Sequence, residues 1–287
     1  MVEDDLKTIL LIVDHGLTLA NFLLTDLARL LIEQDVRLVL LVQDELIPQM
    51  QKDYGNQAGL VFDSMREDQA LRYQKKVAPG VQEVMEYVRK ASLAPPVPLT
   101  YVDTHRQRKE YEARGRWKQV LISARPAIYL LRGSHLARRA FGWAQQRFFT
   151  PDIYEDLLDQ YQPDLVVSAT AGWRLDRYLL REARRRGIPS AMVTVGWDNP
   201  SAHGIPGAHV DYASVWSEIH RWELNKGMDW PLEKIFVGGF PLYDGYINRK
   251  WLIPREEYFR MHGLDPNKRL IAYAATALSI SPNLHIV

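Results

Sequence analysis

Short apolar runs recur along this chain, separated by longer segments in which apolar residues return every three or four positions. Six runs lack the polar alternation of a half-exposed strand and are expected to be buried β-strands, at residues 7–13, 36–43, 164–168, 190–195, 212–216 and 234–237. Residues 60–62 are a further candidate strand. Apolar strands that alternate with helices predict an α/β fold with a parallel sheet and helices on both faces.

In the segments between these strands, apolar residues recur with the period of an α-helix. We expect helices at 18–34, at 151–161, at 174–186 with Gly187 as its C-cap, and at 217–227. A further helical stretch at 66–93 is broken at Pro79-Gly80. Residues 104–149 predict one or two helices, interrupted near Pro126 and Gly133. About 66–150 is therefore expected to form a helical insertion in the first domain.

The pattern changes after residue 240. Residues 241–265 read as an interdomain connector with a short helix at 255–262, and 269–274 begins a new apolar strand. One strand and a loop cannot bury a core of their own. We therefore expect a first domain at 1–240 and, at 266–287, the first strand and loop of an incomplete second domain.

Composition narrows the class of protein. The chain has 287 residues, of which 47% are hydrophobic and 25% charged, as in a folded globular protein. The lack of cysteine excludes disulfides, thiolate metal sites and cysteine nucleophiles, and it fits a reducing cytoplasmic location. The apolar run at 9–13 is too short for a signal peptide or a membrane span. Phosphate-loop, dinucleotide-binding and His-Glu-x-x-His motifs are absent, so NTPase, dinucleotide and metal chemistry lose support.

Charge is concentrated in one segment. The whole chain has a net charge of +1, yet residues 104–147 hold eleven Lys and Arg against Glu110 and Glu112, a local +9. Aromatic and leucine side chains are interleaved with these cations. That pattern fits a helix at an anionic membrane surface, or a solvated helix face above an ordinary core. No nucleic-acid-binding module accompanies it, so no nucleic acid partner is expected.

Polar, aromatic and glycine residues follow the strand at 190–195, in the order Trp197-Asp198-Asn199-Pro200-Ser201-Ala202-His203-Gly204. Ligands of open α/β sheets bind outside the carboxyl ends of the strands, so a site is expected here. Asp198 and Asn199 would bind or accept a proton, and Trp197 would offer a stacking face to a sugar. The alternative is a core aromatic followed by an ordinary turn.

A second cluster, Asp14-His15-Gly16, follows the first strand and opens the first helix. Backbone amides at such a position can meet a ligand, and histidine is suited to accepting a hydroxyl proton near neutral pH. The alternative is that His15 belongs to the helix cap and that Asp14 is bonded locally. Both interpretations remain open from the sequence.

Several segments resemble a bacterial surface-carbohydrate glycosyltransferase family with the GT-B fold. Residues 197–204 are similar to its W-D-N-L-T-S-K-G motif, with Pro200, Ala202 and His203 in place of Leu, Ser and Lys. Residues 215–218 are similar to its V-W-N-E motif and 237–244 to V-T-G-x-x-x-F-D. Residues 272–283 are similar to the first strand of its donor domain. The resemblance implies two facing Rossmann-like domains, of which this chain holds the acceptor domain and the start of the donor domain.

The resemblance also implies an activity and its residues. Sugar would pass from a nucleotide-sugar donor, the co-substrate, to a hydroxyl of a surface glycan or lipid-linked acceptor, with no further cofactor and no metal. The implied roles are catalysis by His15 or Asp198, substrate binding by Asp14, Gly16, Trp197, Asn199, Ser201 and His203, and donor binding by Thr276, Ala277 and Ser279. Two alternatives are a sugar-nucleotide epimerase of the same fold and a non-catalytic glycan- or lipid-binding module. Without the rest of a donor domain, this 287-residue form is expected to be inactive alone.

Overall fold

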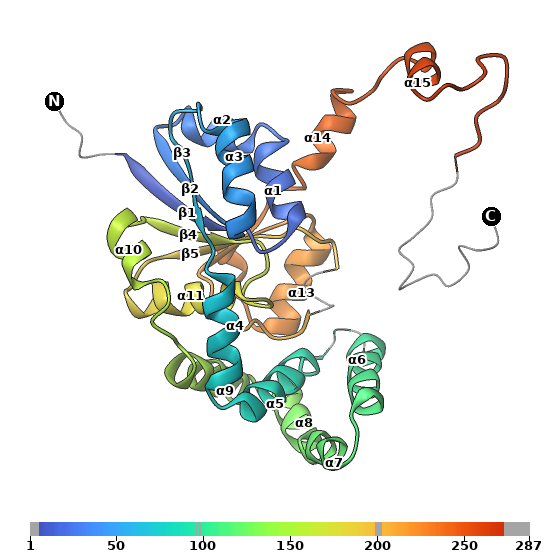
Figure 1. The fold of residues 1–287 in the computed structure, drawn as a ribbon. Helices are drawn as coiled ribbons and strands as arrows, with labels where there is room; N and C mark the ends of the chain where they lie inside the picture. Colours follow the sequence, from blue (N-terminus) through green and yellow to red (C-terminus); the bar gives the residue numbers. More distant parts are fainter. Residues whose placement is uncertain (1–5, 96, 98, 199–202, 273–287) are drawn as a thin grey trace. The chain divides into compact units, whose positions relative to one another are not determined.

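The computed structural model describes residues 6–95, 97, 99–198 and 203–272 (Figure 1). The chain forms two compact units, Met1–Asp244 and Gly245–Val287. Within the described residues, no helix is both long enough and apolar enough to cross a membrane.

One seven-stranded sheet organises the first unit. Its strands are β1 (Lys7–Ile12), β2 (Val36–Val42), β3 (Leu60–Ser64), β4 (Leu165–Ser168), β5 (Ser190–Val193), β6 (Tyr212–Val215) and β7 (Ile235–Val237). Their order is β3-β2-β1-β4-β5-β6-β7, and every neighbouring pair is parallel. The predicted Rossmann-like parallel α/β fold is confirmed.

Apolar side chains cover the sheet on both faces because alternate strand residues point to opposite sides. Leu10 and Ile12 of β1 belong to one core, and Leu11 belongs to the other. Helices α1 (Gly16–Leu23), α2 (Leu27–Ile32) and α3 (Ile47–Tyr54) pack on the second core. Helices α10 (Glu155–Tyr161), α11 (Asp176–Arg185) and α13 (Glu218–Met228) pack on the first, which explains the absence of polar alternation in the strands.

The single helix expected at 18–34 is wrong, because α1 and α2 are separate helices. The hydroxyl of Thr25 donates to the carbonyl of Asn21 and accepts from the amide N–H of Leu27 at 3.2 Å. Local hydroxyl bonds of this kind compete with the helical hydrogen-bond ladder. Hydrophobic period alone does not detect such a break.

The insertion contains more helices than the one or two expected in its second half. Its helices are α4 (Glu67–Lys76), α5 (Pro79–Lys90), α6 (Leu99–Glu112), α7 (Arg116–Ser123), α8 (Arg125–Gly133) and α9 (His135–Phe148). The break at Pro79 and the interruptions near Pro126 and Gly133 are present. A further break lies at Gly115, whose φ of +57° favours glycine. Ser134 caps α9 by accepting from the amide of Ala137.

Three short elements complete the connections, the 3₁₀ turns η1 (Asp44–Leu46) and η2 (Leu232–Lys234) and helix α14 (Leu242–Ile247). The second unit contains α15 (Arg255–Met261), close to the helix expected at 255–262. The strand expected at 269–274 is absent from residues 269–272, and its last two residues lie outside the described part.

Candidate functional site

Three loops leave the sheet at the carboxyl ends of β1, β4 and β5. β4 pairs with β1 on the side opposite β2, so the chain order of the strands reverses between β1 and β4. Crevices at such a switch point are the usual ligand sites of open parallel sheets. The candidate site is therefore built from the loops that begin at Asp14, Ala169 and Thr194.

Asp14 is a buried carboxyl group at this switch point, with 2% of its side chain exposed. Its Oδ2 lies 3.4 Å from the hydroxyl of Thr170 and 3.7 Å from Nε of Arg174. Its Oδ1 has no hydrogen-bond partner among the described residues. Burial, assisted by the negative charge of Asp176, raises the pKa of Asp14 to about 8. Asp14 therefore carries a proton at neutral pH, and perturbed carboxyl groups of this kind gather at functional sites.

His15 is the N-cap residue of α1. Its Nδ1 accepts a hydrogen bond from the amide of Leu17 at 3.1 Å. Burial and the nearby positive charge of Arg174 lower its pKa. The neutral ring therefore carries its proton on Nε2, which makes Nε2 the hydrogen-bond donor of the ring. Gly16 follows as the first residue of α1, with open space where a side chain would begin.

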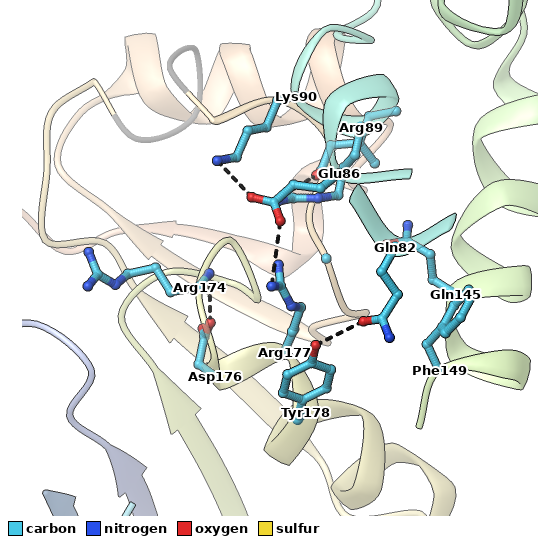
Figure 2. Close-up of polar contacts among 12 residues, drawn as sticks. Gln82, Glu86, Arg89, Lys90, Gln145, Phe149, Arg174, Asp176, Arg177 and Tyr178 are labelled. Carbon is cyan, nitrogen blue, oxygen red and sulfur yellow. Dashed lines mark hydrogen bonds and ion pairs between the residues drawn. The ribbon is translucent and has the colours of Figure 1, made fainter. Parts of the chain in front are cut away.

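The loop between β4 and α11 supplies residues that the sequence analysis missed. Asp176 accepts from the amides of Gly172 at 2.7 Å and Arg174 at 3.1 Å, which closes the loop (Figure 2). The ring of Trp173 stacks on the ring of His203, with centroids 5.2 Å apart and planes at 27°. Its indole N–H donates to the carbonyl of Gly204 at 3.1 Å. A search for polar residues after each predicted strand would have found this loop.

Trp197 and Asp198 follow β5, and their exposures differ. Trp197 is 69% exposed, so it is not a core aromatic that closes the sheet. Asp198 is half-buried, and its negative charge acts on His203 and on two residues of α13, His220 and Glu223. The loop after β5 and helix α13 therefore come together around Asp198.

Burial controls the protonation of the groups around Asp198. It lowers the pKa of His203 to about 4, with further lowering by Lys90, and it lowers the pKa of His220. It raises the pKa of Glu223, and the charge of Asp198 raises it further. His203 and His220 are thus neutral imidazoles near pH 7, and Nδ1 of His220 has no partner among the described residues.

Other predicted site residues fall outside the described residues. They are Asn199 and Ser201 beside Asp198, and Thr276, Ala277 and Ser279 of the expected donor domain. The described part of the chain contains no group of three or more His, Cys, Asp or Glu side chains placed to hold a metal ion.

A groove of about 780 Å³ lies at the amino edge of the sheet, opposite the candidate site. Residues 205–211, which precede β6, line it together with 228–231 and Lys234, which precede β7, and with α9. Its residues include an ion pair of Arg138 with Asp229 at 2.5 Å and a hydrogen bond between Nε2 of His209 and Oδ1 of Asp211 at 3.1 Å. Since catalytic loops of parallel sheets lie at the carboxyl edge, we assign the candidate site to the switch point instead of this groove.

Comparisons of the chain with protein families, with curated protein sequences and with solved structures find no match.

The buried proton on Asp14 predicts a pH-dependent stability. Asp14 ionises near its ordinary pKa of 3.8 when unfolded but near 8 when folded, so the folded state binds more protons between these values. Stability is therefore lost as pH rises through this window. In Asp14→Asn, which mimics the neutral carboxyl, unfolding free energy relative to the parent should rise by roughly 1–3 kcal/mol from pH 5 to pH 7.5.

Denaturant unfolding of both proteins at several pH values measures this difference. Burial raises the pKa of Glu182 to about 7. Glu182 therefore changes the stability of both proteins with pH in the same way, and its contribution cancels in the difference. A parent-minus-variant difference that does not change with pH would contradict the assignment of a proton to Asp14.

Proposed function

We propose that this chain carries the acceptor side of a glycosyltransferase that uses a nucleotide-sugar donor. The observation that carries the proposal is the exposed ring of Trp197 beside Asp198 at the carboxyl edge of the sheet. An exposed indole next to a carboxylate suits a sugar, since the ring covers the apolar face of the sugar and the carboxylate accepts its hydroxyl protons. The similarity of residues 197–204 to the glycosyltransferase motif supports the same activity.

In the proposed reaction, the acceptor hydroxyl oxygen forms a bond to the anomeric carbon of the donor sugar. The bond from that carbon to the diphosphate oxygen breaks, and the nucleoside diphosphate leaves. Asp198 accepts the hydroxyl proton as general base. His15 is unsuited to this role because its Nδ1 already accepts the amide of Leu17. His15 instead donates its Nε2 hydrogen to an oxygen of the acceptor.

Sugar-nucleotide epimerisation is the second candidate, since it requires several carboxylates at one site. Asp14, Asp198 and Glu223 all reach the carboxyl edge, and the pKa values of Asp14 and Glu223 are raised, chiefly by burial. A pair of carboxyl groups in different protonation states can exchange protons with a sugar carbon or oxygen.

A product assay separates the two candidates. The protein expressed from its complete reading frame is incubated with a panel of nucleotide sugars, with and without lipid-linked glycans. The proposal predicts release of nucleoside diphosphate that increases when an acceptor is present. Conversion of the donor to its epimer, with the nucleotide still attached, would instead identify an epimerase. If no nucleotide sugar of the panel gave either product, only the third alternative, a non-catalytic binding module, would remain.

An anionic membrane at the cytoplasmic face is the proposed partner surface of the insertion. Tyr129, Leu130, Leu136, Trp143 and Phe148 of α8 and α9 are each more than 60% exposed. Arg139 and Arg147 of α9 are also exposed. Arg138 does not belong to this surface, because it is 8% exposed and bonded to Asp229 and to the carbonyls of Leu131 and Arg132.

Vesicle binding tests the proposed surface. Each cation near an anionic leaflet contributes on the order of 1 kcal/mol, so Arg139→Ser with Arg147→Ser should weaken binding to anionic vesicles by about 10-fold or more at low salt. Lys52→Ser with Lys226→Ser is the matched control, because both lysines are exposed on other helices. Co-sedimentation with anionic and neutral vesicles measures the effect. Equal binding to both kinds, or equal losses in both variants, would contradict the surface.

A further inference from the structure

A small polar cavity of about 20 Å³ lies where α5, α9 and α11 meet. Its charged lining consists of three guanidinium groups, Arg89, Arg177 and Arg181, and one carboxylate, Glu86 (Figure 2 shows all but Arg181 labelled). All three arginines are buried, and Arg89 is only 1% exposed. A cavity of this size holds one or two waters or one monatomic ion, and it is too small for phosphate or a nucleotide.

Two buried N–H groups at this cavity have no hydrogen-bond partner within the described part of the chain. They are Nη2 of Arg89 and Nε2 of Gln145, whose side chain is 5% exposed. The amide oxygen of Gln145 accepts from Nη2 of Arg181 at 3.1 Å, which leaves the NH₂ group as the unbonded end. Leaving such donors unpaired destabilises the folded state, and more so for a charged group. An acceptor inside the cavity would remove this cost.

Two acceptors at the cavity have protein partners. Glu86 pairs with Lys90 at 2.9 Å, with Arg177 at 3.7 Å and, beyond hydrogen-bond distance, with Nη2 of Arg89 at 4.0 Å. The amide oxygen of Gln82 accepts from the hydroxyl of Tyr178 at 3.1 Å (Figure 2). A water molecule would need acceptors for its own two hydrogens, whereas an anion only accepts. An anion can accept from both unpaired donors, and it also places negative charge beside the three guanidinium groups of the lining.

Electrostatics favour the same occupant. Three guanidinium charges face one carboxylate, whose own charge is shared with Lys90 outside the cavity. Burial, together with the charge of Arg177, lowers the pKa of Arg89 to about 10 and that of Arg181 to about 9. Burial is the main cause of both shifts, and the repulsion from Arg177 adds to it.

We propose that this cavity is a binding site for a monatomic anion, chloride in ordinary salt solutions, held by Nη2 of Arg89 and Nε2 of Gln145. The anion joins α5 to α9 within the helical insertion and faces Arg177 and Arg181 of α11. Its role is to hold these helices together. It is independent of the proposed glycosyl transfer.

Thermal unfolding of the full chain tests this site without any variant. A ligand that binds only the folded state raises Tm with its concentration above Kd. At constant sodium concentration, replacing gluconate by chloride from about 1 mM to about 300 mM should raise Tm by roughly 3–6 °C and then saturate. Bromide should replace chloride, and its anomalous scattering in a crystal should give a peak between Arg89 and Gln145.

Gln145→Glu supplies a carboxylate in place of the anion while keeping the side-chain size. Its Tm is expected to be independent of chloride and at least as high as that of the parent in gluconate. Gln119→Glu, at an exposed position on α7, is the matched control and should keep the chloride response. Equal Tm in chloride and gluconate for the parent would overturn the proposal. So would a chloride response that persists unchanged in Gln145→Glu, because it would be a general salt effect.

Discussion

Asp198→Asn is expected to lower the rate of glycosyl transfer by about 100-fold or more, because asparagine cannot take the proton from the acceptor hydroxyl. The substitution keeps the shape of the side chain, so the acceptor should still bind and the loss should fall on kcat. Initial rates of nucleoside diphosphate release over a range of acceptor concentrations measure the two effects separately. The measurement requires the protein from its complete reading frame.

Asp35→Asn is the matched control for this substitution. Asp35 is exposed just before β2, at the amino edge of the sheet, and its φ of +57° suits asparagine equally well. The rate of glycosyl transfer by Asp35→Asn should equal that of the parent. A near-normal rate for Asp198→Asn, with an unchanged Tm, would remove Asp198 from the role of base.

Gly204→Ala is expected to destabilise the protein by about 2–4 kcal/mol, from backbone strain and steric overlap together. Gly204 has a φ of +71°, and an added Cβ would lie 2.4 Å from the carbonyl oxygen of Arg89 and 2.6 Å from Cα of Lys90. Neither backbone atom can move away without distorting the end of α5. The site loop is tied to the same place, since the amide of Ile205 donates to the carbonyl of Arg89 at 3.1 Å.

Gly142→Ala provides the control for this second substitution. Gly142 lies within α9, where an added Cβ would meet nothing within 4 Å. Replacing it should stabilise the helix by about 0.5–1 kcal/mol. Denaturant unfolding of both variants measures the contrast. If Gly204→Ala and Gly142→Ala had equal unfolding free energies, the loop of Gly204 would not depend on its close approach to α5.

The sheet could be predicted from the sequence because its strands are nearly continuous apolar runs. Residues 10–12 of β1 and 38–42 of β2 are fully buried on both faces, and few other structures explain such runs. The insertion was less predictable. Its helices end at local features such as the turn at Gly115 and the cap at Ser134, and long arginine side chains such as Arg138 are buried where their charge suggests exposure.

The candidate site was only partly predictable for a related reason. Asp14, His15 and Asp198 could be found because each follows a recognisable strand. His220 and Glu223 lie on the face of a helix after a different strand, and only the folded chain brings them near Asp198. The pairing of Arg138 with Asp229, 91 residues away, is likewise invisible in the sequence.

Hydroxyl-radical labelling of two tryptophans tests the proposal that substrates bind at the carboxyl edge of the sheet. Trp197 at the candidate site is 69% exposed, and Trp143 at the groove on the opposite edge is 63% exposed, so both should react with hydroxyl radicals in the free protein. With the nucleotide sugar and a lipid-free glycan acceptor added, Trp197 should become protected and Trp143 should not, as read by mass spectrometry. Protection of Trp143 with Trp197 unchanged would contradict it.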